Sequence, residues 1–271
     1  MRKWIIGILL AVFSCMLLIS AGVLGKYYWE SYNEQGRFNE LSQLKPSVSR
    51  PDPTEESATD ATKPTTSYTE VTDPKTGQTR LILKEFEELY CMNSDLVGWL
   101  EIPGTGINYP VLHAPDRNEY YLHRDFDKNY SKRGCLFVQE NADVFAPSDN
   151  VTIYGHRMKD GTMFARLDKY IEKSFYKENP YIYFDTLSEL HTYQVMAVFL
   201  TTASVGEGFA YHNFVNAVDA TEYYDFVNTC KSLSLYDTSI SAEYGDKLIC
   251  LSTCEYSQEN GRLVVVAKRI Q

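Results

Sequence analysis

Eight short apolar runs recur along the later two-thirds of the chain, and this pattern limits the fold more than any other feature of the sequence. Each run is rich in β-branched and aromatic residues and is separated from the next by turn residues, as strands are. The runs cover residues 97–102, 107–112, 135–138, 151–154, 181–184, 193–200, 247–252 and 263–267. Strands of this length and spacing predict a mainly β fold whose sheet closes, or nearly closes, into a barrel.

Helical patterns interrupt these predicted strands. One covers residues 162–170, and a short helix near residues 83–90 leads into the barrel. The longest covers residues 220–233, where helical spacing puts five apolar residues on one stripe: Tyr223, Phe226, Val227, Cys230 and Leu233. The predicted fold is therefore a β-barrel with peripheral helices.

The N-terminus carries an uncharged apolar run from Trp4 to Gly25, preceded by Arg2 and Lys3. As a helix this run spans about 33 Å, which is close to the thickness of a bilayer. The basic residues at its start predict a cytoplasmic N-terminus, with everything after Lys26 outside the cell. A cleaved signal peptide is the alternative, but its apolar stretch is usually only about 7–15 residues long. We expect an uncleaved, single-pass membrane anchor.

A change of composition separates this anchor from the predicted barrel. Residues 46–79 are rich in Pro, Thr and Ser and contain almost no large apolar residue, so they predict a flexible stalk. We expect four parts along the chain: a cytoplasmic tip at 1–3, a transmembrane anchor at 4–25, a polar juxtamembrane segment and stalk at 26–80, and a folded domain at 81–271.

The charge and the cysteines exclude several classes of function. The formal net charge is −10, and we expect no nucleic-acid partner because the clustered Lys and Arg of a phosphate-binding surface are missing. The six cysteines form no Cys-x-x-Cys pair, which argues against a zinc site or a redox pair. Cys250 and Cys254 share one predicted strand, which separates their Cα atoms by about 13 Å, too far for a disulfide. We expect a free thiol and no metal or other cofactor.

Three motifs place reactive side chains at the ends of predicted strands. The run Thr-Ile-Tyr-Gly-His ends at His156, the run Leu-Ser-Thr-Cys ends at Cys254, and Gly-Arg, with Arg262, begins the last strand. A rigid sheet presents such terminal residues to a solvent-facing cleft.

These three side chains together suffice for acyl transfer from a peptide bond. A cysteine attacks as its thiolate, and a neighbouring imidazole can take its proton and later protonate the leaving amine. The oxyanion of the tetrahedral intermediate needs a fixed positive donor, which the permanently charged guanidinium of an arginine provides.

The segments around these residues resemble those of class B sortases. The family's histidine segment resembles residues 150–164, Asn-Val-Thr-Ile-Tyr-Gly-His-Arg-Met-Lys-Asp-Gly-Thr-Met-Phe. Its cysteine and arginine segments resemble Leu-Ser-Thr-Cys-Glu at 251–255 and Gly-Arg-Leu-Val-Val-Val-Ala-Lys at 261–268. Further similarity lies in Val-Gly-Trp-Leu at 97–100, Asn-Tyr-Pro-Val-Leu at 108–112 and Asn-Glu-Tyr-Tyr-Leu at 118–122.

The resemblance implies the eight-stranded sortase barrel, with a long helix before the cysteine strand. It implies Cys254 as nucleophile, His156 as its proton partner and Arg262 as the oxyanion clamp. Contacts with the substrate peptide fall, by the same resemblance, on Asn118, Leu122, Tyr154, Ser252 and Glu255.

The implied activity is that of a membrane-bound cysteine transpeptidase, a thiol peptidase of a Gram-positive cell. Its substrates are surface proteins with a C-terminal sorting signal of the Asn-Pro-x-Thr-x kind, cleaved after Thr through a thioester. Its acceptor is an amine of a lipid-linked peptidoglycan precursor.

Other interpretations start from the same motifs. A pilin-polymerising class B sortase has the same site but uses a pilin lysine as acceptor. A papain-like protease has Cys before His in the chain, and here the order is reversed. A non-catalytic surface-binding barrel has no need for the three reactive residues.

The segment from Asp73 to Gly77, Asp-Pro-Lys-Thr-Gly, resembles a sorting signal and suggests an autoinhibitory pseudosubstrate. The same residue types suit an exposed bend, and no apolar stretch and basic tail follow, as they do after a sorting signal. We predict a turn.

Overall fold

Helix α1 forms the N-terminal unit of the protein. The computed structural model describes residues 2–45, 67–117, 119–204, 206–256 and 260–271. The chain divides into two compact units, Met1–Gln43 and Leu44–Gln271, and α1 runs from Arg2 to Leu44. The apolar side chains from Trp4 to Leu24 are exposed, and the mean hydropathy of the helix reaches 2.5 over a window long enough to cross a membrane. The helix has the length and composition of a membrane anchor.

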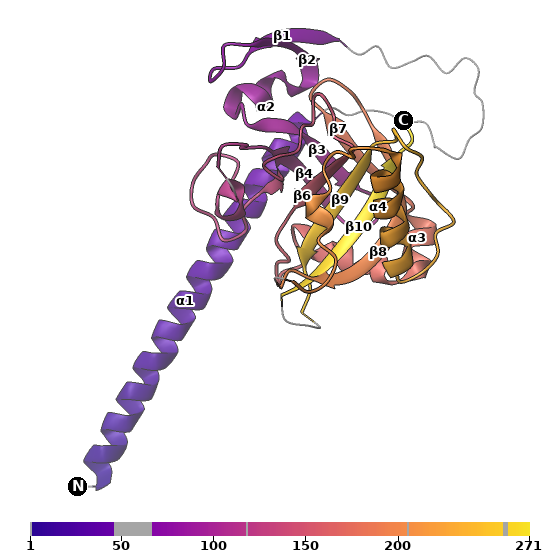
Figure 1. Cartoon of the computed structure of the whole chain (residues 1–271). Coiled ribbons are helices and arrows are strands. Elements are labelled where there is room, and N and C mark those ends of the chain that lie inside the picture. Colours follow the sequence, from indigo (N-terminus) through magenta and orange to yellow (C-terminus); the bar gives the residue numbers. More distant parts are fainter. Residues whose placement is uncertain (1, 46–66, 118, 205, 257–259) are drawn as a thin grey trace. The chain divides into compact units, whose positions relative to one another are not determined.

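The second unit is built around a closed barrel of eight strands (Figure 1). The strands are β3 (Leu96–Ile102), β4 (Ile107–Leu112), β5 (Leu136–Val138), β6 (Asn150–Tyr154), β7 (Tyr181–Thr186), β8 (Thr192–Thr202), β9 (Leu248–Cys254) and β10 (Gly261–Arg269). Their order around the barrel is β10-β8-β7-β3-β4-β5-β6-β9. Each of the eight apolar runs forms one strand, so the predicted barrel is confirmed.

Both faces of β9 and β10 are buried because the barrel interior covers one face and helix α4 (Ala220–Leu233) covers part of the other (Figure 1). Side chains alternate between the two faces. Leu248 and Cys250 of β9, with Val264 and Val266 of β10, pack in the apolar cluster under α4. Cys254 and Arg262 lie on the same face of these two strands but are not part of this cluster.

Helix α4 buries the predicted apolar stripe except at its last residue. Tyr223, Phe226, Val227 and Cys230 are buried, whereas Leu233 is 41% exposed. Leu233, the last residue of the stripe, is exposed because the helix ends there and the chain turns away at Ser234. The helix begins at a capping residue, Asp219, whose carboxylate accepts a hydrogen bond from the Glu222 amide at 3.0 Å.

The pairing of β6, β9 and β10 brings three strand ends to one edge of the barrel. Strand β6 runs parallel to β9, with Tyr154 opposite Ser252. Strand β10 runs antiparallel to β9, with Arg262 opposite Cys254. The carboxyl ends of β6 and β9 therefore meet the amino end of β10.

Short helices fill the connections. They are η1 (Lys84–Phe86), α2 (Glu87–Met92), η2 (Tyr120–His123), η3 (Phe164–Ile171), α3 (Lys173–Glu178) and η4 (Tyr211–Asn213). The helical pattern predicted at 162–170 corresponds to η3, which is a 3-10 helix.

A β-hairpin precedes the barrel, at the end of the segment predicted as a stalk. Its strands are β1 (Tyr68–Thr72) and β2 (Thr79–Leu83). The structure differs from the prediction here because Val71 and Ile82 are buried and the β-branched Thr residues, counted as stalk composition, suit strands. Residues 46–66 of the predicted stalk lie outside the described part of the chain.

The turn of this hairpin is the segment that resembles a sorting signal. The Asp73 amide donates to the Gln78 carbonyl and the Gly77 amide to the Asp73 carbonyl, both at 2.8 Å. Gly77 has a φ of +70°, a conformation in which glycine carries no steric penalty. The predicted turn is confirmed.

Candidate active site

Cys254 is the last residue of β9 and is half-buried. Four residues earlier, Cys250 is fully buried in the cluster under α4, and this burial raises the pKa of its thiol well above the ordinary value. All six cysteines are free, so the prediction that these two do not pair is confirmed. One strand thus carries an inert thiol in the core and a second thiol at its open end.

His156 follows β6 after Gly155, where the neighbouring side chains leave no room for a Cβ atom. A Cβ atom on Gly155 would lie 2.5 Å from Leu136 Cδ2 and 2.8 Å from the Phe164 ring. The Gly155 amide donates to the Ser252 carbonyl at 3.2 Å. This close approach ties the histidine to the cysteine strand.

The imidazole of His156 is held by a backbone carbonyl. Its Nε2 lies 2.7 Å from the carbonyl oxygen of Leu122. A carbonyl only accepts, so Nε2 carries the hydrogen and Nδ1 is left for proton exchange. Burial lowers the pKa of His156; the Leu122 carbonyl acts in the opposite direction, and His123, with its ring centroid 5.5 Å away, lowers it further. The neutral imidazole is favoured.

Arg262 lies opposite Cys254 across the β9–β10 ladder. Its Nη1 donates to the backbone carbonyls of Asn260 at 3.2 Å and Gly261 at 3.0 Å. Within the described part of the chain no carboxylate forms an ion pair with this guanidinium. Its positive charge is therefore not neutralised locally.

These three side chains line one cavity of about 740 Å³ at the edge where the strand ends meet. Of the residues predicted to contact the substrate peptide, Leu122, Tyr154 and Ser252 also line it. The alternation along β9 explains this, because Ser252 and Cys254 continue the face that Cys250 begins.

Two predicted contacts are not placed in this cavity. Glu255 is not among the residues that line it; its carboxylate lies 3.9 Å from Arg157 Nη1, and its amide donates to the Gly261 carbonyl at 2.8 Å. Asn118 lies outside the described residues. Both roles stay predictions.

The cavity has further walls besides the predicted peptide contacts. Tyr211 of η4 lines it, and its hydroxyl lies 2.5 Å from Ser252 Oγ. Burial raises the pKa of Tyr211 to about 12, so the hydroxyl keeps its proton. Arg117, Tyr120 and Tyr121 line the cavity from the connection between β4 and β5.

A buried carboxylate fixes the β4–β5 connection. The side chain of Asp95 is 2% exposed and accepts a hydrogen bond from the Tyr121 hydroxyl at 2.7 Å. It pairs with Arg117 at 3.2 Å, with Lys128 at 3.3 Å and with Lys75 of the hairpin turn. Four donors around one carboxylate hold this connection against the barrel.

These contacts also set the charge of Asp95. Burial alone would raise its pKa, but hydrogen bonds from Lys75 and Tyr121 and the charge of Lys128 outweigh burial and hold the pKa of Asp95 below its ordinary value. Asp95 is therefore ionised at neutral pH.

No group of three His, Cys, Asp or Glu side chains suited to a metal occurs among the described residues.

Comparison with known proteins identifies the family. A family model described as the Sortase domain matches residues 100–270. Sortase B of Staphylococcus aureus is 33% identical over 189 residues, which are 69% of this chain and 75% of that protein. Sortase B of Listeria monocytogenes is 34% identical over 189 residues, 69% of this chain and 74% of that protein.

Comparison with solved structures identifies the same family. Sortase B from Bacillus anthracis, crystallised with AAEK1, superposes with a TM-score of 0.68 at 28% identity, covering 90% of this chain and 99% of that one. A Staphylococcus aureus sortase B–substrate complex superposes with a TM-score of 0.64 at 32% identity, covering 70% of this chain and 86% of that one. The chain belongs to the sortase family. Within it, the chain is a class B sortase, and such relatives indicate a cysteine transpeptidase.

Proposed function

We propose that this protein cleaves a C-terminal sorting signal of the Asn-Pro-x-Thr-x kind after Thr and transfers the surface protein to a peptidoglycan amine. One observation supports this most: a single cavity receives Cys254, His156 and Arg262 from three strand ends. The family resemblance supplies the signal and the acceptor.

The first half of the reaction forms a thioester. His156 Nδ1 takes the proton of Cys254, and the thiolate attacks the carbonyl carbon of the Thr residue. Arg262 stabilises the oxyanion of the tetrahedral intermediate, because its charge is not neutralised by a neighbouring carboxylate. The C–N bond then breaks, and the leaving amine takes the proton from Nδ1.

The substrate peptide occupies the same cavity. Leu122 and Tyr154 offer apolar surface, and Ser252 together with Tyr211 offers a hydroxyl pair. A related sortase B has been crystallised as a substrate complex, which supports the binding of a sorting-signal peptide. Asn118 and Glu255 remain proposed contacts.

The second half of the reaction determines the biological role. An amine of a lipid-linked peptidoglycan precursor attacks the thioester and releases Cys254. The apolar helix α1 supports this acceptor, because a single-pass anchor with a cytoplasmic N-terminus and an external catalytic domain would keep the enzyme where the lipid-linked precursor emerges. A pilin lysine is the alternative acceptor, and comparing the two amines in one assay distinguishes them.

Mass spectrometry of the intact protein tests the cleavage. Full-length protein in detergent, mixed with an Asn-Pro-x-Thr-x peptide, should gain one acyl adduct, and Cys254→Ala should gain none. Cys91→Ala is the control because Cys91 is an exposed thiol outside the cavity, and it should retain the adduct. An adduct on another cysteine, or none on the wild type, would refute the assignment and favour a non-catalytic binding barrel.

A further inference from the structure

The loop from Arg157 to Met163 follows His156 directly and closes back on it. Arg157 and Met163 form an isolated antiparallel bridge, and the Phe164 amide donates to the His156 carbonyl at 2.9 Å. Because both ends of this loop meet at the histidine, a shift of the loop is passed on to the histidine backbone. The segment 157–163 is here called the histidine loop.

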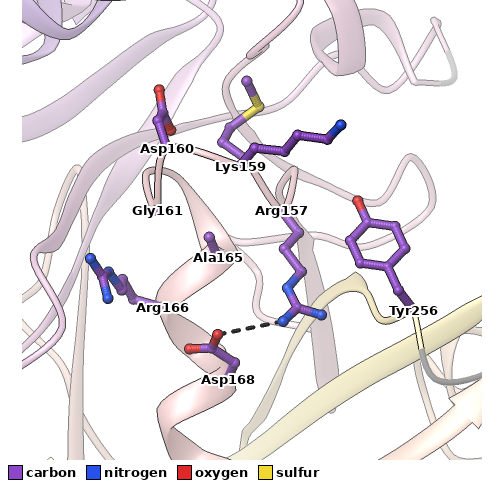
Figure 2. A pocket seen from close by; sticks show the side chains of 9 residues that line it. Arg157, Lys159, Asp160, Gly161, Ala165, Arg166, Asp168 and Tyr256 are labelled. Atoms are coloured by element: carbon purple, nitrogen blue, oxygen red, sulfur yellow. Dashed lines mark hydrogen bonds and ion pairs between the residues drawn. The ribbon is translucent and has the colours of Figure 1, made fainter.

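Asp160 lies beside Gly161 in the turn of the histidine loop (Figure 2). Its Oδ1 accepts hydrogen bonds from the Thr162 hydroxyl at 2.6 Å and from the Thr162 amide at 3.1 Å. Figure 2 shows its carboxylate away from the ion pair of Arg157 with Asp168. The two acidic side chains of this region therefore serve different cations.

The cation that pairs with Asp160 is Arg133, from the connection between β4 and β5. Arg133 Nη2 donates to Asp160 Oδ2 at 2.9 Å, and Nη1 donates to the Thr162 hydroxyl. The side chain of Arg133 is only 1% exposed, and that of Asp160 is 30% exposed. Separating a buried charge from its partner is strongly destabilising. The guanidinium therefore holds the histidine loop against the β4–β5 connection.

The backbone at Arg133 is itself fixed beside the carbonyl that orients the imidazole. A Cβ atom on the next residue, Gly134, would lie 2.5 Å from the carbonyl oxygen of Leu122. The Ser131 hydroxyl accepts hydrogen bonds from the Arg133 amide at 3.1 Å and the Gly134 amide at 3.2 Å. Arg133 thus belongs to a tightly bonded turn that packs against Leu122.

We propose that Arg133, through Asp160 and Thr162, is a positioning residue for His156. The inference rests on the proposed transpeptidase function, in which Nδ1 of the imidazole exchanges the proton. Two segments hold this histidine: the histidine loop holds its backbone, and the Leu122 carbonyl holds its Nε2 at 2.7 Å. Arg133 joins the two segments, so that the carbonyl stays in line with Nε2.

The chemical consequence is the choice of tautomer. A neutral imidazole carries one hydrogen, and its hydrogen-bond partner decides which nitrogen holds it. While the Leu122 carbonyl faces Nε2, the hydrogen stays there and Nδ1 can accept a proton. When the two segments separate, some molecules carry the hydrogen on Nδ1 and are inactive. The peptide contacts are not the target, so kcat should fall while KM changes little.

The tautomer of His156 is measured by 15N NMR on full-length protein in detergent, with both histidine ring nitrogens labelled. Loss of the signal in His156→Gln assigns it. The wild type should carry the hydrogen on Nε2. Asp160→Asn removes the charge and Thr162→Val the hydroxyl, and each should shift the spectrum toward a mixture of tautomers. Thr162→Ser keeps the hydroxyl and should rescue the wild-type spectrum.

The rate of thioester formation at saturating peptide is the second readout. Asp160→Asn should lower it about tenfold, since a small misplacement of a reacting group can cost about a hundredfold, and Thr162→Val should lower it less. Asp149→Asn is the matched control. Asp149 also joins distant segments, pairing with Lys247 at 2.8 Å, but it precedes β6 at the end opposite His156. This control should lower Tm and keep the wild-type tautomer and rate.

An unchanged tautomer in both Asp160→Asn and Thr162→Val would overturn the inference, whatever the change in Tm. A tautomer shift in Asp149→Asn would overturn it as well, because general loosening of the fold would then explain the effect. Failure of the proposed function is seen separately. If the wild type forms no thioester, that function is wrong, and the tautomer spectra, which need no substrate, still decide whether Arg133 positions the imidazole.

Discussion

One wall of the catalytic cavity consists of strand ends and another of the connection between β4 and β5, and different forces hold them. The strand wall carries Ser252, Cys254 and Arg262, which are set by the backbone ladders of β6, β9 and β10. The loop wall carries Arg117, Tyr120, Tyr121 and Leu122, which depend on contacts with the buried carboxylate of Asp95.

This difference divides the three proposed catalytic residues between the two walls. The proposed nucleophile, Cys254, and the proposed oxyanion donor, Arg262, stand on the ladder, whose backbone hydrogen bonds involve no ionisable group. The imidazole is oriented by the Leu122 carbonyl, and the neighbouring Tyr121 is bound to Asp95. We therefore expect substitutions in the strand wall to affect the chemical step, and those behind the loop wall to affect both positioning and stability.

The largest effect is expected from Arg262→Lys in the strand wall. Loss of one oxyanion donor costs about 3 kcal/mol, or more than about a hundredfold in rate, and Lys does not reproduce the planar fork. Single-turnover thioester formation measures this directly. Arg269→Lys, on the same strand but outside the cavity, is the control. A rate within about threefold of wild type would mean that Arg262 supplies only diffuse charge.

Behind the loop wall, Asp95→Asn should lower kcat/KM about tenfold and destabilise the fold by about 2 kcal/mol, the usual contribution of a hydrogen bond to a charged group. Three cations would lose their carboxylate. Asp116→Asn, an exposed change in the same connection, should have no effect. Unchanged activity with lowered stability would show that the loop wall does not position His156.

The pH dependence of the same variant sharpens the comparison. The pKa of Asp95 is lowered in the folded protein, so its stabilising contribution is complete above the ordinary carboxyl pKa of about 3.9 and is lost as the pH falls through the folded pKa. The difference in Tm between wild type and Asp95→Asn should be constant near neutral pH and vanish in acid. A difference that persists below both pKa values would contradict a charge-based role.

The smallest effect is expected from His123→Gln. Burial is the main cause of the lowered pKa of His156, and His123 adds to it. Removing His123 should raise the pKa of His156 by less than about half a pH unit. NMR titration of the imidazole measures this, with His212→Gln, on the η4 side of the cavity, as the control. A fall in the pKa would show that the two rings do not interact as described.

Much of the fold and part of the site could be predicted from the sequence. The eight strands and α4 follow from apolar periodicity, which is a local property. The motifs predicted Cys254, His156 and Arg262 at or near strand ends, where the structure has them. The resemblance named Leu122, Tyr154 and Ser252, which line the same cavity; the roles of all six stay predictions. The β1–β2 hairpin was missed, because composition averaged over a long segment hides two short strands.

The sequence by itself determined the eight barrel strands and the side chains that are candidates for acyl-transfer chemistry, because both depend on residue type and on near neighbours. Only the tertiary structure decided that β6 lies parallel to β9, so that Thr253 Oγ1 donates to the Gly155 carbonyl at 2.8 Å across 98 residues. Only the tertiary structure gathered Lys75, Arg117 and Lys128 around Asp95. The physical reason is that backbone pairing and charge clustering depend on distances between residues far apart along the chain, and no local pattern encodes those distances.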